Sequence, residues 1–516
     1  RAGEDGAMQR VARLAELEEG RGRRVELGAE KILLVREGDT VRAYQASCPH
    51  AGGPLEEGVI RAGRIICPWH KGNFRVSDGA LCEPPALDSL ARYPVQVEGG
   101  VVYVTPRPIP PPEPSRREDP RTFVLVGAGA AGAAAASALR ESGFGGRILL
   151  VGREPHAPYD RTSLSKFVIS GDMAPGKVPP LRPPGFYAAK GIERIEARVT
   201  RLDVKARRVE LEDGRSFSYD AALVAPGGEP KRLEVPGAGL EGVSTLRTLE
   251  DAEVLLAQAP PGARAVILGN SFIGLEAASA LRHRKVEVTV VAPHDIPFVK
   301  QFGEQVGRMF KSLHERNGVV FRSGTTAARF EGKGRVSAVV LEDGERLAAE
   351  LVLVATGVRP ATGFLQGLVL REDGGIPVDA SMRAAEGLFA AGDVAAFPLG
   401  GRTVRIEHWR VAQEHARLAV RNMLGASEPY AGVPFFWTYH YTRRFEYLGH
   451  ADVWDEVRID GDLEGLSFVA LLIKDGQVAA AIACDRERAT AALLERMRAP
   501  VPVEEALALI PSGSFR

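Results

Sequence analysis

Cysteine is scarce in this sequence. Only Cys48, Cys67, Cys82 and Cys484 occur among 516 residues, which is too few for the disulfide framework of a small secreted protein. We expect Cys82 and Cys484 to be buried, inert side chains that pack as small apolar groups.

Net charge is also absent, because 66 basic side chains balance 66 acidic ones. A neutral chain gives no electrostatic reason to expect nucleic acid or an anionic membrane as a partner. The uncharged run Phe123 to Leu139 is rich in glycine and alanine and lies between Arg121 and Arg140. It is too short and too weakly apolar for a membrane span. A cytoplasmic protein is the default expectation.

The chain is too long for one hydrophobic core, and three or four domains are expected. Its 57 glycines and 35 prolines suit a loop-rich α/β protein.

A dinucleotide-binding pattern follows Phe123–Val126, an apolar run that predicts a buried strand. Gly127, Gly129 and Gly132 come next, then an alanine-rich helix and a second strand that leads to Glu154. In such a βαβ unit the glycines allow a tight turn, close approach of a pyrophosphate, and close packing of helix on strand. The helix N-terminus attracts phosphate, and Glu154 can accept the hydroxyls of an adenine ribose.

The pattern recurs between Ala265 and the strand that ends at Ala292, with Gly269, Ser271 and Gly274 at the glycine positions. Serine at the middle position narrows the approach to a pyrophosphate. Ala292 occupies the position at which an NADH-binding unit usually carries an acidic residue. The sequence therefore does not decide between NADH and NADPH.

Short β-rich segments separated by Gly and Asp turns fill Val25 to Val104 and predict an all-β domain. Two loops within it carry Cys48, His50, Cys67 and His70 in C-x-H and C-x-x-H spacing. Two cysteines and two histidines are one donor set for tetrahedral zinc. Paired loops of this form favour a two-iron cluster instead, with thiolates on one iron and imidazoles on the other.

These loops resemble the Rieske [2Fe-2S] domain, which implies that these four residues are the cluster ligands. High-potential members carry an extra disulfide between the loops, whereas the corresponding positions here are Gly53 and Trp69. The hydroxyl that often follows the second histidine is replaced by Lys71-Gly72. Fewer hydrogen bonds to the sulfides predict a low-potential cluster.

Proline is concentrated between Thr105 and Arg121, which predicts an extended linker without helix or central strand. At about 3.1 Å per residue, such a segment can span roughly 45 Å.

The segment Pro158 to Lys166 resembles that of the ferredoxin reductases and apoptosis-inducing-factor flavoproteins. The resemblance places Arg161 and Lys166 along FAD, with the lysine near the isoalloxazine. It also implies that Phe272 packs near the nicotinamide or flavin ring, and that Glu276 pairs with Lys166 as the catalytic pair.

Later segments resemble further FAD and NAD(P)H motifs of the same group. The residues taken from them are Ala225, Gly227, Lys231, Gly357, Gly392, Asp393, His408 and Trp409. Glu407, His408 and Trp409 are expected on one helix that runs to Leu424.

The whole order resembles Rieske-bearing, apoptosis-inducing-factor-like ferredoxin reductases. The fold class expected is an all-β Rieske domain, two Rossmann-like domains and a C-terminal α+β domain that shields the flavin and can form a homodimer. The expected boundaries are 1–104 for the Rieske domain, 105–121 for the linker, 122–238 and 362–430 for the two parts of the FAD domain, 239–361 for the NAD(P) domain, and 431–516 for the C-terminal domain.

The resemblance implies that electrons pass from NAD(P)H through FAD to the [2Fe-2S] cluster and on to a ferredoxin, a cytochrome or an oxygenase component. A disulfide reductase is excluded because no cysteine pair follows Glu154 or lies in the NAD(P) domain. A Rieske oxygenase needs a separate domain that holds a mononuclear iron. The flavoprotein motifs occupy the rest of this chain, so that function is excluded. A redox sensor that binds NADH with little turnover uses the same motifs and stays open.

Overall fold

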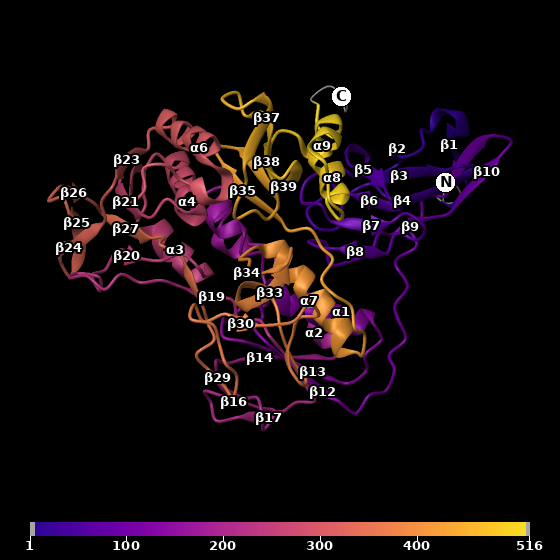
Figure 1. Cartoon of the computed structure of the whole chain (residues 1–516). Helices are drawn as coiled ribbons and strands as arrows, with labels where there is room; N and C mark the ends of the chain where they lie inside the picture. Colours follow the sequence, from indigo (N-terminus) through magenta and orange to yellow (C-terminus); the bar gives the residue numbers. More distant parts are fainter. Residues whose placement is uncertain (1–5, 512–516) are drawn as a thin grey trace.

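The structure is a computed structural model that describes residues 6–511. Figure 1 shows an indigo β domain beside the yellow C-terminal helices. One nucleotide-binding unit lies below the C-terminal sheet in this view, and the other lies to its left. The β domain also contacts that segment through a small apolar cluster of Val59, Ile66, Ala491 and Ala492.

The N-terminal domain consists of three small sheets whose neighbouring strands are antiparallel. In sheet order, the strands are β2 (Arg23–Leu27), β3 (Glu30–Glu37), β4 (Thr40–Gln45) and β9 (Arg92–Tyr93); β1 (Gln9–Arg13), β11 (Val101–Val104) and β10 (Val95–Glu98); and β5 (Val59–Arg61), β6 (Arg64–Ile66), β7 (Asn73–Arg75) and β8 (Leu81–Glu83). Strand β1 was not expected, because Gln-Arg-Val-Ala-Arg has little apolar alternation and is held by distant β11.

The proline-rich segment 105–121 contains no helix or strand, as predicted. Single bridges fix it at two points, one between Ile109 and Arg92 and one between Arg117 and Phe144. In Figure 1 it descends as a purple trace from the β domain toward β12.

The first nucleotide-binding unit is built on a six-stranded sheet in which only the edge strand β31 is antiparallel. Leu125 of β12 lies opposite both Leu150 and Leu223 in parallel register. Its strands in order are β14 (Ile192–Glu196), β13 (Arg147–Gly152), β12 (Thr122–Val126), β18 (Ala221–Val224), β32 (Leu388–Ala390) and β31 (Arg383–Ala385).

Helices α1 (Ala130–Glu141) and α7 (Trp409–Met423) share one apolar cluster with this sheet, and the alanines of α1 let the backbones approach closely. Smaller elements complete the unit: α2 (Phe186–Ala189), β15 (Val199–Asp203), β16 (Arg208–Leu211), β17 (Ser216–Ser218), β19 (Gly228–Pro230), β29 (Leu365–Gln366), β30 (Ile376–Pro377), β33 (Ala395–Leu399) and β34 (Arg402–Arg405).

The second unit repeats this plan with a five-stranded parallel sheet. In order, its strands are β20 (Val243–Ser244), β27 (Leu351–Val354), β21 (Arg264–Leu268), β22 (Glu287–Ala292) and β23 (Val320–Ser323). Its other elements are α3 (Leu249–Ala257), α4 (Phe272–His283), α5 (Val299–Phe302), α6 (Glu304–Arg316), β24 (Ala327–Lys333), β25 (Arg335–Leu341), β26 (Arg346–Ala348) and β28 (Val358–Pro360).

The C-terminal segment forms a five-stranded antiparallel sheet with two helices. The elements are β35 (Phe435–His440), β36 (Arg443–Gly449), β39 (Gln477–Cys484), β38 (Ser467–Lys474), β37 (Glu456–Asp462), α8 (Glu487–Arg496) and α9 (Val503–Leu509). Strand β37 is a charged edge strand that its sequence did not reveal. No helix within residues 6–511 is long and apolar enough to cross a membrane.

Two local expectations were wrong. Helix α7 begins at Trp409 with His408 at its N-cap, so Glu407 and His408 precede the helix. Cys82 is only half-buried in the short edge strand β8, where its Sγ lies 3.6 Å from the Ala80 carbonyl oxygen. Cys484 is buried at the end of β39, as expected.

Candidate functional site

A cavity of about 1210 Å³ lies where the two nucleotide-binding units meet the C-terminal sheet. Its wall includes Gly129 of the first glycine motif, Phe272 of the second, Asp393, His408 and Trp437. Distant segments of the chain therefore converge on one space, which is large enough for an extended cofactor.

The first glycine motif fits a dinucleotide. A Cβ on Gly127 would lie 2.0 Å from the Ala225 carbonyl oxygen, and one on Gly132 would lie 1.8 Å from the Gly127 carbonyl oxygen. A Cβ on Gly129 would meet nothing within 4 Å. The outer glycines are thus required by the fold, whereas Gly129 leaves open space at the N-terminus of α1, where a pyrophosphate would be held.

Glu154 lies in the cavity wall, and both of its oxygens are engaged. Arg161 and Tyr159 donate to them, and Arg161 also donates to the Arg247 carbonyl oxygen at 2.7 Å. Burial would raise the pKa of Glu154, but the Arg161 cation and these hydrogen bonds outweigh it and lower the pKa. A carboxylate held ionised in this way is suited to accept hydroxyl groups.

Asp393 follows β32 in a short 3-10 turn and lies 3.1 Å from the Arg247 guanidinium. Nearby, the His408 ring stacks on Phe436 with centroids 4.6 Å apart. Its Nδ1 is buried without a hydrogen-bond partner among the described residues, and burial lowers its pKa to about 3. An unpartnered buried nitrogen in the cavity wall fits the polar edge of a bound cofactor.

The second glycine motif keeps the same geometry despite its serine. Gly269 and Gly274 pack against backbone, since a Cβ on Gly269 would lie 2.3 Å from the Ala355 carbonyl oxygen. Ser271 caps α4, because its Oγ accepts from the Gly274 amide at 3.4 Å and donates to the Ala355 carbonyl oxygen at 3.0 Å. The hydroxyl thus takes part in a helix cap. Ala292 is buried at the end of β22.

The predicted catalytic pair comes together from the short helix Leu164–Val168 and from α4. Lys166 Nζ lies 2.9 Å from Glu276 Oε1, and both side chains lie in the cavity wall. The Glu276 carboxylate also accepts from Ser165, from Thr438 Oγ1 at 2.8 Å and from the Tyr439 amide at 2.8 Å.

The remaining predicted residues divide into two groups. Ala225, Gly227, Gly357, Gly392 and Trp409 lie in the cavity wall. Lys231 is set back from it, beside Gly357, whose carbonyl oxygen accepts from the Lys231 amide at 2.9 Å.

The cluster loops bring their four donors together in two pairs. The Nδ1 atoms of His50 and His70 face each other at 3.2 Å. A hydrogen bond to Cys48 lowers the pKa of Cys67, and the amides of Trp69 and His70 lower it further. No three His, Cys, Asp or Glu side chains within residues 6–511 converge on one metal position. Two thiols and two imidazoles in separate pairs fit a two-iron cluster better than a single zinc ion.

Buried ion pairs join the cluster loops to the rest of the chain, and sequence analysis missed them. Lys71, directly after His70, is fully buried and lies 2.7 Å from Glu446 of β36. Burial lowers the pKa of Lys71 and raises that of Glu446. Arg410 of α7, also fully buried, donates to the Lys71 carbonyl oxygen at 2.9 Å.

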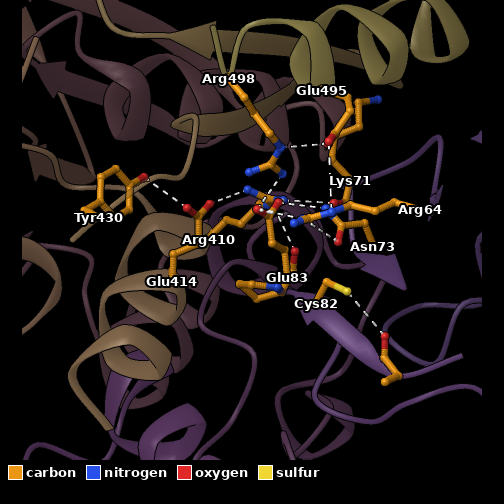
Figure 2. Close-up of polar contacts among 12 residues, drawn as sticks. Arg64, Lys71, Asn73, Cys82, Glu83, Arg410, Glu414, Tyr430, Glu495 and Arg498 are labelled. Atoms are coloured by element: carbon orange, nitrogen blue, oxygen red, sulfur yellow. Dashed lines mark hydrogen bonds and ion pairs between the residues drawn. The ribbon is translucent and has the colours of Figure 1, made fainter. Parts of the chain in front are cut away.

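Glu83 of β8 is the centre of this contact, as Figure 2 shows. Arg410 and Arg498 reach its carboxylate at 2.9 and 2.5 Å. Burial would raise the pKa of Glu83, but these two cations outweigh it and lower the pKa to about 2. The N-terminal domain is therefore fixed against both α7 and the C-terminal segment.

Trp437 connects the two sites. Its indole lies 4.5 Å from the His70 ring, centroid to centroid, and it also forms part of the cavity wall. The aromatic run Phe435–Trp437 was visible in the sequence, but a buried strand explains such a run equally well.

These features define a flavoprotein oxidoreductase with two dinucleotide sites and an attached iron–sulfur domain. Residues 121–416 match the model of the pyridine nucleotide-disulphide oxidoreductases, and residues 7–94 match that of the Rieske [2Fe-2S] domain. The chain belongs to the pyridine nucleotide-disulphide oxidoreductase family and carries a Rieske domain. It thus uses FAD, NAD(P)H and a [2Fe-2S] cluster.

Two relatives show how far the similarity extends. Human apoptosis-inducing factor 3 is 39% identical over 491 residues, which cover 91% of this chain and 80% of that protein. The ferredoxin–NAD(+) reductase component of the biphenyl dioxygenase system of Paraburkholderia xenovorans is 37% identical, over 74% of this chain and 95% of that protein.

Among solved structures, the ferredoxin reductase for the CYP199A2 system of Rhodopseudomonas palustris superimposes with a TM-score of 0.71 at 30% identity. The match covers 77% of this chain and 98% of that one.

Proposed function

We propose that this chain is an NAD(P)H-dependent reductase in which electrons pass from FAD to the Rieske cluster of the same chain and then to a one-electron acceptor. The contact between His70 and Trp437 carries the proposal, because it links a cluster ligand to the wall of the dinucleotide cavity. The acceptor would be a small redox protein, as the names of the ferredoxin reductases among the relatives suggest.

The residues have separate tasks in this scheme. The first glycine motif, Glu154 and Asp393 would hold FAD, while Phe272 and the second motif would position NAD(P)H. Lys166 and Glu276 would face the reacting ring. When bound, FAD supplies the conversion between two-electron and one-electron transfer.

Cys48, Cys67, His50 and His70 would hold the cluster. The domain boundaries given above remain part of this proposal.

Anaerobic stopped-flow mixing with NADH, and separately with NADPH, tests the scheme. Flavin absorbance should bleach first and the cluster bands should follow. In His70→Ala, flavin reduction should persist while cluster-dependent reduction of cytochrome c is lost. A cluster that stays oxidised after the flavin is reduced would contradict the intramolecular route, and slow turnover with a persistent charge-transfer band would favour a sensor.

A further inference from the structure

Buried side chains form a continuous line of hydrogen bonds from the cavity toward the turn between β35 and β36. The line starts at Glu276, whose Oε2 accepts from Thr438 Oγ1 at 2.8 Å. Thr438 Oγ1 lies 2.9 Å from His440 Nε2, and His440 Nδ1 lies 3.1 Å from His314 Nε2. His314 Nδ1 then lies 2.8 Å from the Tyr441 hydroxyl. We call this series the Glu276–Tyr441 chain.

The chain crosses three elements and ends at a half-buried tyrosine. Glu276 is on α4, His314 on α6, and Thr438 and His440 on β35. Both histidines are fully buried, whereas Tyr441 is only half-buried and adjoins the exposed Thr442. No link in the series is longer than 3.1 Å, so each lies within hydrogen-bond distance.

Burial favours the neutral form of both imidazoles. Burial and the neighbouring His440 lower the pKa of His314 well below its ordinary value. Burial and the Lys166 cation lower the pKa of His440 to about 3, although a hydrogen bond to the Leu275 backbone opposes them. A neutral imidazole has one N–H and one lone pair, so it can receive a proton on one side and release one on the other.

The hydrogen positions can be assigned from the acceptor end. Because the Thr438 hydroxyl donates to the Glu276 carboxylate, its oxygen accepts from His440 Nε2–H. His440 Nδ1 then accepts from His314 Nε2–H, and His314 Nδ1 accepts from Tyr441. Every link thus contains one hydrogen, and every donor points toward Glu276.

The proposed reaction produces a proton inside the cavity. A hydride carries two electrons and one proton, whereas one-electron acceptors take electrons alone. Each NAD(P)H therefore yields NAD(P)+, two reduced acceptors and one proton that must reach water. Lys166 and Glu276 are the pair in the cavity wall from which the chain leads outward.

We propose that the Glu276–Tyr441 chain conducts this proton to water. The inference rests on the proposed function, because only single-electron acceptors leave a proton behind. In the resting arrangement each ring holds its N–H on the nitrogen that faces Glu276. Before an outward transfer, the hydroxyls rotate and both rings change to the other tautomer, in which the N–H is on the nitrogen that faces Tyr441. A proton then enters at Glu276 while another leaves from the Tyr441 hydroxyl, and every residue ends with its original number of hydrogens. The transfer returns each N–H to the nitrogen that faces Glu276, which is the resting arrangement.

Proton release during a single turnover tests the proposal. Holoprotein reduced with NADH is mixed with ferricyanide in weakly buffered solution that contains a pH dye, and flavin, cluster and dye are followed together. Wild-type protein should release its proton as the flavin reoxidises, with a slower rate in D₂O. In His440→Gln and in Tyr441→Phe, proton release should be slower by about tenfold or more, while reduction by NADH stays within twofold.

Three further variants separate proton conduction from packing. Phe310→Leu alters the ring that lies 5.3 Å from His440 without removing a link, and it should behave like wild type. Thr438→Val should reproduce the His440→Gln defect, and Thr438→Ser should restore the rate. Nitrogen-15 spectra of histidine-labelled holoprotein should show both rings neutral at pH 7, with Nε2 protonated.

Each failure has its own signature. Wild-type proton release from His440→Gln and Tyr441→Phe, or a charged His314 or His440 at pH 7, would overturn the chain. If the cluster of wild-type protein is never reduced, the proposed function is overturned, whether or not the dye reports proton release. Folding of each variant is checked by FAD content and circular dichroism, and Tyr441→Phe removes only a hydroxyl at the half-buried end.

Discussion

The imidazole of His70 and the indole of Trp437 lie against each other with centroids 4.5 Å apart and an interplanar angle of 45°. One ring belongs to a cluster loop and the other to β35, more than three hundred residues later. Trp437 should therefore control transfer between the two cofactors.

Replacing Trp437 with phenylalanine should slow cluster reduction by about tenfold, equivalent to roughly 1.4 kcal/mol of barrier. Flavin reduction by NADH should change little. Rapid-mixing absorbance at the two sets of bands measures both rates. Trp454→Phe, at a partly exposed indole, is the matched control; equal slowing in the two variants would contradict the role of Trp437.

Arg410→Gln should destabilise the protein by about 3–5 kcal/mol, because it leaves the Glu83 carboxylate buried without one of its cations. Denaturant unfolding followed by circular dichroism measures the loss. Arg147→Gln removes an exposed pair with Glu193 and should cost less than about 1 kcal/mol.

A double variant isolates the ion pair within that effect. Glu83→Gln added to Arg410→Gln should cost less than the two single changes together, since the partners contact each other. Strict additivity would mean that the pair contributes nothing.

Protonation of Glu83 should lower the free energy of unfolding at acid pH. Its folded pKa of about 2 lies below the ordinary glutamate value, so its contribution is full above about pH 5 and is lost as the pH falls toward 2. The whole contribution is roughly 3 kcal/mol, of which about 2 kcal/mol should be gone by pH 3. Unfolding of wild type and Glu83→Gln at pH 6 and pH 3 measures this difference; parallel losses in the two proteins would rule it out.

Two glycine substitutions should have different effects. Gly129→Ala adds a methyl group to open space, so the apoprotein should remain stable while FAD binding weakens. Gly127→Ala places a Cβ 2.0 Å from a backbone oxygen at a φ of +110°, so the fold itself should be destabilised. Thermal unfolding of apoprotein and FAD titration distinguish the two, and normal FAD affinity in Gly129→Ala would contradict the assigned role.

Local sequence patterns predicted much of this molecule. The glycine motifs, the parallel strands and the spacing of His50 and His70 within the cluster loops depend on neighbours in the chain. The Lys166–Glu276 pair followed from the family resemblance.

The contacts of Arg410 with Lys71 and of His314 with His440 join segments that are distant in sequence. No short-range period marks such partners, because an isolated arginine or histidine looks the same on a surface and in a core. The start of α7 was misjudged by two residues for a related reason: the fold uses Glu407 and His408 in the cavity wall instead of the helix.

The segment 105–121 has a consequence for kinetics. It joins the Rieske domain covalently to the flavoprotein, so dilution does not separate the two. Under the proposed route the flavin-to-cluster step is then first order, with a rate that stays the same at nanomolar and micromolar protein. In a reductase with a separate carrier protein, the corresponding electron-transfer rate would fall as the proteins are diluted.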